Sequence, residues 1–199
     1  MSRYAIDVVI LPPEPVMDLA IKWNQQLSIP HEQSIFLNKT DKLPHISMLM
    51  GCLTTTSLEK AAAILEQVTR SQAPIALHIP GLQFTEGSHP VAALDVVLSE
   101  ELTNFQRILI DAYRPLIAQD AHETDLFDPQ PISPSVLEWI NRFIPEQCYE
   151  RFWPHITLGH GRTVEKQEPL TFRAIRIAIC HLGNHCTCRK ILAEASLMG

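Results

Sequence analysis

The sequence predicts an α+β fold, and three observations support this class. Its 199 residues are 46% hydrophobic and 19% charged, a composition typical of a chain that buries a core as one domain or two packed lobes. Strand-type and helix-type apolar patterns both occur along the chain. Their order is β-α-β-α-β-β-β-α, an excursion and three further strands, so helices do not alternate regularly with strands.

The first half of the chain predicts two strand and helix pairs. Residues 4–10 form an apolar run typical of a buried strand, and an amphipathic helix is expected over residues 14–27. A second strand is centred on His45, and Thr56 with Glu59 predicts a capping box for the helix after it. His45 is therefore expected on a strand between two helices.

A third helix is followed by a segment of different composition. Ser99 predicts the start of a helix whose apolar residues continue at helical spacing to Leu116. Residues 118–150 form an acidic, proline-rich excursion, in which a short helix is expected from Ser135 to Ile144. The remaining strands are expected at 74–86, 91–98, 153–158, 171–182 and 189–197.

The charge and the lengths of the apolar runs exclude two classes of partner. The formal net charge is -6, whereas proteins that wrap long DNA or RNA neutralise phosphates with Lys and Arg. A small nucleotide or the end of an RNA is compatible with this charge. No apolar run approaches the ~20 residues that span a bilayer, so no membrane role is expected.

The cysteine count and the first residues predict a cytoplasmic protein with reduced thiols. The five cysteines are an odd number, and the N-terminus lacks the apolar region of a secretory signal. The cysteines are Cys52, Cys148, Cys180, Cys186 and Cys188.

A short internal repeat carries the functional signal. Residues 44–51 and 154–161 share Pro, His and Ile, then a hydroxyl residue, and both end in Gly. On a strand, side chains two residues apart point to the same face, so His45 lies beside Ser47 and His155 beside Thr157. Each strand thus presents an imidazole and a hydroxyl together.

These four side chains match the needs of phosphodiester cleavage. One imidazole, from His45 or His155, takes a proton from the attacking water, and the other gives a proton to the leaving oxygen. The hydroxyls of Ser47 and Thr157 can donate hydrogen bonds to the non-bridging phosphate oxygens. This chemistry requires no metal and no cofactor, and the residues alone do not say which His is the acid.

The paired His-x-(Ser/Thr) motifs resemble those of the 2H phosphoesterase superfamily, in its 2′-5′ RNA ligase-like or cyclic phosphodiesterase branch. The resemblance implies one domain over residues 1–199 with two pseudo-symmetric lobes, each a mainly antiparallel sheet with packed helices, and an active site in the groove between them. It implies hydrolysis of 2′,3′-cyclic or related 2′-5′ phosphodiesters of nucleotides or RNA ends, with His45 and His155 as the acid/base pair. The acidic excursion is expected to cap this groove, and the protein is expected to be a monomer.

Other residues near the second motif have two interpretations each. Arg151 and Arg162 either hold phosphate oxygens or form surface ion pairs. Phe152 and Trp153 either stack on a base or pack in the core. His160, five residues after the motif histidine, is expected on the opposite face of a regular strand.

Two alternative functions remain open. The first is a non-catalytic module that binds nucleotides or RNA ends. The second is a metal-dependent hydrolase that uses the Cys and His residues between Cys180 and Cys188, a segment that otherwise predicts a hairpin with its turn at Gly183 and Asn184. Asp7, on the first strand, is assigned no role.

Overall fold

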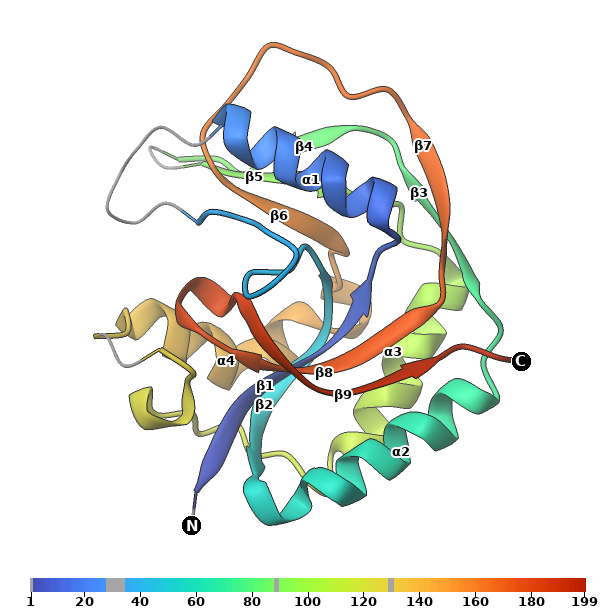
Figure 1. The fold of residues 1–199 in the computed structure, drawn as a ribbon, viewed down its shortest axis with the longest axis vertical. Coiled ribbons are helices and arrows are strands. Elements are labelled where there is room, and N and C mark those ends of the chain that lie inside the picture. The colour runs from blue at the N-terminus through green and yellow to red at the C-terminus, as the bar shows by residue number, and fades with distance from the viewer. Residues whose placement is uncertain (1, 28–34, 88–89, 129–130) are drawn as a thin grey trace.

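The computed structural model describes residues 2–27, 35–87, 90–128 and 131–199 (Figure 1). Within these residues a larger sheet has seven strands and a smaller sheet has two, and all neighbouring strands are antiparallel. In spatial order, the larger sheet contains β4 (Leu82–Phe84), β5 (Val91–Asp95), β6 (His155–His160), β2 (Ile46–Thr54), β1 (Arg3–Leu11), β8 (Arg176–Leu182) and β9 (Cys188–Ser196). The smaller sheet pairs β3 (Ile75–Ile79) with β7 (Leu170–Ala174). The predicted α+β class is confirmed.

Four helices in the described residues pack against the larger sheet (Figure 1). They are α1 (Glu14–Leu27), α2 (Leu58–Arg70), α3 (Glu100–Tyr113) and α4 (Pro134–Gln147), and the short 3₁₀ turns are η1 (Thr55–Ser57), η2 (Glu123–Asp125), η3 (Tyr149–Arg151) and η4 (Asn184–Cys186). Helix α1 contacts β6, α2 contacts β8 and β9, and α3 and α4 contact β2. The helix predicted from Ser135 to Ile144 is longer in the structure, and Pro134 occupies its favourable first position.

The larger sheet consists of two groups of strands that meet at one point. Strands β4, β5 and β6 form one group, and β2, β1, β8 and β9 form the other. In the described part of the chain, the groups are joined by a single registered pair between β2 and β6, Ile46 with Ile156. The two motif strands are therefore neighbours in one continuous sheet.

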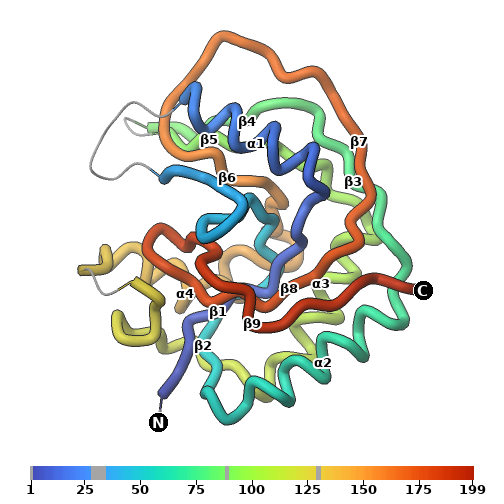
Figure 2. The backbone as a smooth tube through the Cα atoms, in the orientation of Figure 1, coloured from blue at the N-terminus to red at the C-terminus, as the bar shows by residue number. Residues whose placement is uncertain are grey.

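Two segments predicted as single strands are divided between the sheets. Residues 74–86 form β3 and β4, separated by Pro80 and Gly81, and residues 171–182 form β7 and β8. Gly81 has a φ of 157°, a backbone conformation that residues other than glycine rarely adopt. Figure 2 shows β3 and β7 side by side along one edge of the molecule, from which the chain turns into the larger sheet.

Helix starts were predicted with mixed success. Ser99 caps α3 as predicted, because its Oγ accepts a backbone N–H at 3.1 Å. The prediction of a capping box formed by Thr56 and Glu59 is wrong. Helix α2 begins at Leu58 with Ser57 as its N-cap, because the preceding residues form the 3₁₀ turn η1.

Both motif strands contain a β-bulge directly after the motif hydroxyl. In β2 the extra residue is Met48, since its two neighbours pair with adjacent residues of β1. In β6 the extra residue is Leu158, since its two neighbours pair with adjacent residues of β5. A bulge leaves the extra residue without its normal partner in the ladder and reverses the alternation of faces beyond it.

Buried side-chain amides bind the carbonyl groups of both bulged residues. Gln106 of α3 donates from Nε2 to the carbonyl oxygen of Met48 at 3.2 Å. Asn24 of α1 donates from Nδ2 to the carbonyl oxygen of Leu158 at 2.6 Å, and it makes two further bonds to the backbone of residues 35–37. Since both amide side chains are buried, these bonds fix the bulges from inside the core.

We expect Asn24→Ala to lower the free energy of unfolding by about 3 kcal/mol. The substitution leaves several buried backbone groups without a partner, and each such group costs ~1–3 kcal/mol. Chemical denaturation followed by circular dichroism measures the change. Gln25→Ala, on the exposed face of the same helix, should change stability by less than about 0.5 kcal/mol. Equal losses in the two variants would contradict a structural role for the amide.

Candidate active site

The pairing of β2 with β6 brings the two copies of the repeat together. Ile46 pairs with Ile156 in an antiparallel arrangement, and both side chains are fully buried on one face of the sheet. The residues on either side of this pair point to the other face. The motif residues of both strands therefore share one face.

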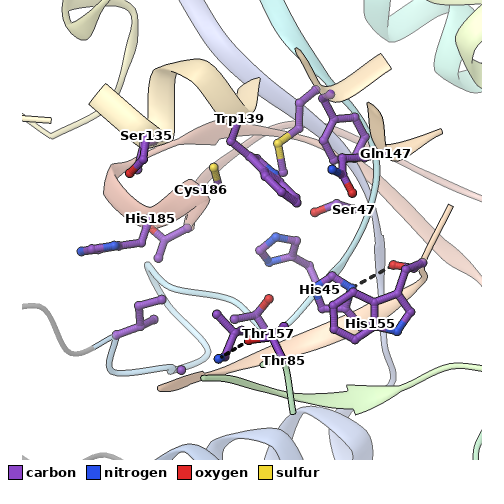
Figure 3. A pocket seen from close by; sticks show the side chains of 18 of the residues that line it. His45, Ser47, Thr85, Ser135, Trp139, Gln147, His155, Thr157, His185 and Cys186 are labelled. Atoms are coloured by element: carbon purple, nitrogen blue, oxygen red, sulfur yellow. Dashed lines mark hydrogen bonds between the residues drawn. The ribbon is translucent and has the colours of Figure 1, made fainter. Parts of the chain in front are cut away.

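This register places each imidazole opposite the hydroxyl of the other motif. One step from the paired isoleucines, His45 faces Thr157 across the strands and Ser47 faces His155. Cross-strand neighbours have Cβ atoms ~4.5–5.5 Å apart, so the four side chains form a compact group. Figure 3 shows them pointing into one cavity.

The cavity has a volume of about 400 Å³, which is the size of a small-molecule site. Its walls come from the motif strands, from helix α4, from turn η4 and from the segments around β5 and before β2. The lining residues include the motif residues and Leu37, Leu43, Met50, Val91, Val136, Trp139, Phe143, Trp153, His160, His185 and Cys186.

Both motif imidazoles are held through the same nitrogen. Nδ1 of His45 is 2.7 Å from the carbonyl oxygen of Leu43, and Nδ1 of His155 is 2.9 Å from that of Trp153. A carbonyl oxygen only accepts hydrogen bonds, so Nδ1 carries the proton in each ring. Nε2 of each neutral ring therefore keeps a free lone pair, so it can accept a proton as a base and, once protonated, give that proton up as an acid.

Burial lowers the pKa of both imidazoles. For His45 the Leu43 carbonyl opposes this effect and the nearby His155 adds to it. For His155 the carbonyl of Trp153 and the charge of Asp95 oppose it. Burial therefore favours the neutral form of both rings, and an anion bound beside them would favour the charged form.

Trp153 and Asp95 orient the second imidazole. The indole ring stacks on His155, with ring centroids 4.0 Å apart and an interplanar angle of 23°. The indole Nε1 donates to Oδ1 of Asp95 at 2.8 Å. Trp153 and its neighbour Phe152 both line the cavity, and the Phe152 side chain is in addition almost fully buried in the core.

The bulges bring two further side chains to the cavity. His160 was expected on the opposite face, but the extra residue Leu158 reverses the alternation, and His160 lies on the same face as Thr157. Met50 occupies the equivalent position after the bulge in β2 and also lines the cavity. The sequence prediction for His160 was wrong because it assumed a regular strand.

Helix α4 of the excursion forms an aromatic wall. Val136, Trp139 and Phe143 line the cavity, and Figure 3 shows Trp139 directed towards His45 and Ser47. Composition alone did not identify these contacts, because the aromatic residues have the same spacing as ordinary core residues.

The two arginines beside the second motif do not line the cavity. Arg151 is exposed and donates to the carbonyl oxygen of Pro145 at 2.8 Å. Arg162 is exposed and donates to the carbonyl oxygen of Thr85 at 2.9 Å, and Thr85 is itself a lining residue. The described residues that line the cavity include no Lys, Arg, Asp or Glu, so their ionisable side chains are histidines and one thiol.

The cysteines at the end of the chain differ from the prediction of reduced thiols. Cys180 of β8 and Cys188 of β9 form a disulfide, because the pairing of these strands brings their Cα atoms to 5.5 Å. Of the five Cys and His residues from Cys180 to Cys188, these two are therefore not available to a metal as thiolates. The described residues contain no group of three His, Cys, Asp or Glu placed to hold a metal ion. The turn between these strands is η4, where His185 and Cys186 have positive φ values.

In the described part of the chain, the helices are too short or too polar to cross a membrane.

Comparisons with known proteins place this architecture among related chains. The sequence matches the family described as the 2′-5′ RNA ligase superfamily over residues 34–176. The comparison with curated proteins gave no match. TT0787 of Thermus thermophilus is 16% identical with a TM-score of 0.61, and the alignment covers 98% of each chain. E. coli LigT complexed with NADP+ is 13% identical with a TM-score of 0.54, and all of both chains is covered. A structure described as a phosphoesterase is also 13% identical with a TM-score of 0.54, covering 98% of this chain and 99% of the other. These similarities show a shared fold.

We expect inorganic phosphate to raise the pKa of both His45 and His155. In the free protein, burial keeps both titration midpoints below the ordinary value of 6.5, and a shared anion stabilises both charged forms. Nuclear magnetic resonance titration of the imidazole signals, assigned with His→Gln variants, measures the midpoints with and without phosphate. A response from only one of the two rings would show that they do not share an anion.

Proposed function

This chain belongs to the 2′-5′ RNA ligase superfamily, and from that premise we propose that it is a phosphodiesterase that acts without a metal. Its proposed substrates are 2′,3′-cyclic or related 2′-5′ phosphodiesters of small nucleotides or RNA ends. His45 and His155 are the proposed acid/base pair, and Ser47 and Thr157 the proposed phosphate-binding hydroxyls.

One observation carries this proposal. In a single cavity, each motif imidazole donates through Nδ1 to a backbone carbonyl and keeps Nε2 free, and each lies opposite the hydroxyl of the other motif. A structural histidine needs no such duplicate. A tetrahedral anion with an attacking and a leaving oxygen needs two proton-transfer groups and hydrogen-bond donors for its other oxygens.

The proposed reaction is an addition of water to the cyclic phosphate. One neutral imidazole takes a proton from water while the water oxygen forms a bond to phosphorus. The bond from phosphorus to the leaving ribose oxygen breaks, and the other imidazole, in its protonated form, gives its proton to that oxygen. The hydroxyls of Ser47 and Thr157 donate to the non-bridging oxygens as negative charge develops.

The size and character of the cavity favour a small substrate. A volume of about 400 Å³ holds one nucleotide more readily than a polymer, and Trp139 and Phe143 offer apolar surface to a base. Among the similar folds, E. coli LigT has been crystallised with 3′-AMP, with phosphate and with ATP. A small nucleotide is therefore the proposed ligand class.

Arg151 and Arg162 are proposed to contact only the parts of a longer substrate that extend beyond the cavity. Both guanidinium groups are exposed, and Arg162 is bonded to the backbone of the lining residue Thr85. An RNA end with a further phosphate would bring negative charge towards this rim.

We expect His45→Ala and His155→Ala each to lower kcat by about 10²- to 10⁴-fold, since each removes one positioned proton-transfer group. The assay is hydrolysis of nucleoside 2′,3′-cyclic phosphates in the presence of EDTA. His78→Ala, which changes an exposed histidine of β3 outside the cavity, is the matched control. Full activity in either motif variant would defeat the proposal. Tight, salt-sensitive binding by the wild-type protein without product would identify a non-catalytic binding module, and activity lost only in EDTA would identify a metal-dependent hydrolase.

We expect Ser47→Ala and Thr157→Val each to lower kcat by about 10²-fold, with a smaller change in KM. The removed hydroxyl donates most strongly when charge develops on the phosphate oxygens, and loss of one such donor costs ~10²–10³ in rate. Steady-state kinetics with the same cyclic nucleotides measure both parameters. If only KM rises, the hydroxyl binds the ground state and has no catalytic effect.

A further inference from the structure

Asp7 is a buried acid on the face of the sheet that carries the cavity. It lies on β1 opposite the lining residue Met50, and its side chain has no exposed surface. Its Oδ2 is 3.7 Å from Nε2 of His45, which is the nitrogen that Leu43 leaves free. A carboxyl group therefore lies beside the reactive atom of one motif imidazole.

The described surroundings of Asp7 give it no other basic partner. Both carboxyl oxygens are buried without a hydrogen bond of good geometry to any described residue. Burial raises the pKa of this group well above its ordinary range, and the Ser47 side chain and the backbone amides of Leu49 and Met48 oppose the shift only in part. Within the described residues, His45 is the basic side chain at ion-pair distance from the carboxyl group.

Among the described residues, the other ionisable groups that face Asp7 are two thiols, and neither can neutralise it. Cys148 follows α4, and Cys186 lies in η4 at the cavity wall. The pKa of each thiol is raised to about 12, first by burial and then by the proximity of Asp7. Both thiols are therefore uncharged over the working range of pH, and the titration partner that the described residues offer to Asp7 is His45.

On the described strands, the second motif has no equivalent acid. Met50 and His160 are the corresponding residues of the two repeats. Asp7 of β1 pairs with Met50 of β2, and Val91 of β5 pairs with His160 of β6, so Val91 occupies the position equivalent to that of Asp7. The carboxylate that acts on His155 is that of Asp95, which already accepts the indole N–H of Trp153. The two motifs thus differ in one buried carboxyl group.

We propose that Asp7 is a positioning residue that shares one proton with His45, and so makes His45 the general acid and His155 the general base. The assignment of the acid and the base rests on the proposed phosphodiesterase function, whereas the shared proton does not. A carboxyl group beside an imidazole keeps a proton on the pair to higher pH than the imidazole alone, and the two groups titrate together.

The proton balance of the proposed step is complete. His155 takes one proton from water as the new bond from oxygen to phosphorus forms. His45 gives one proton to the leaving ribose oxygen as the old bond breaks. Afterwards His155 holds an extra proton and the pair of Asp7 and His45 lacks one, and exchange with solvent restores both.

The test is Asp7→Asn, which keeps the shape and removes the charge. We expect the titration midpoint of His45, measured by nuclear magnetic resonance, to fall by about 1 to 3 pH units, with that of His155 changed far less. In the pH profile of kcat/KM, the alkaline limb should move to lower pH by a similar amount while the acid limb stays in place. Thermal stability should be unchanged or raised, because the buried carboxyl group lacks a hydrogen-bond partner of good geometry among the described residues.

Two further variants keep the test decisive. Asp111→Asn, an exposed acid of α3, should leave the profile unchanged. If Asp7→Asn does not fold, Asp7→Val carries the same measurement, since valine suits a buried strand position. An unchanged titration of His45 in a folded variant, or a loss of activity that is uniform in pH, would overturn the proposal. If the wild-type protein proves inactive, the proposed function fails, and the titration of His45 still decides whether the pair shares a proton.

Discussion

The antiparallel pair of Ile46 and Ile156 is the contact on which the rest of the site depends. Within the described residues it is the single registered pair that joins two groups of strands, and it sets which residues face each other across the boundary. A shift of one residue in this pairing would move an entire motif to the opposite face of the sheet. Burial of both isoleucine side chains opposes such a shift, because the apolar core on that face would be lost.

The sequence predicted the parts of the fold that depend on local pattern. Apolar spacing located the four helices, and the alternation within each window correctly placed His45 beside Ser47. Features that depend on a partner strand were not visible. The bulge at Leu158 exists only relative to β5, and the disulfide of Cys180 with Cys188 requires the register of β8 with β9. The aromatic wall of α4 was missed because helical periodicity does not reveal which face meets a cavity.

The cavity combines apolar walls with side chains whose charge depends on pH. Because the ionisable groups among its described lining residues are histidines and a thiol, an empty cavity near neutral pH carries little charge, and the pKa of both motif imidazoles is lowered by burial. An anion that enters favours protonation of the rings around it, so ligand binding and proton uptake are coupled.

The paired bulges have a consequence for how these strands tolerate change in length. Beyond Met48 and Leu158, inside and outside are exchanged relative to a regular strand, and buried amides of Gln106 and Asn24 bind the two carbonyl groups at the point of exchange. Deleting Met48 or Leu158 would therefore remove the bulge and leave Met50 or His160 on the cavity face, because the neighbours of each bulged residue already pair with adjacent residues of the partner strand. A bulged residue can thus be lost without a change of register, whereas deletion of a paired residue in the same strand exchanges the two faces at every position that follows.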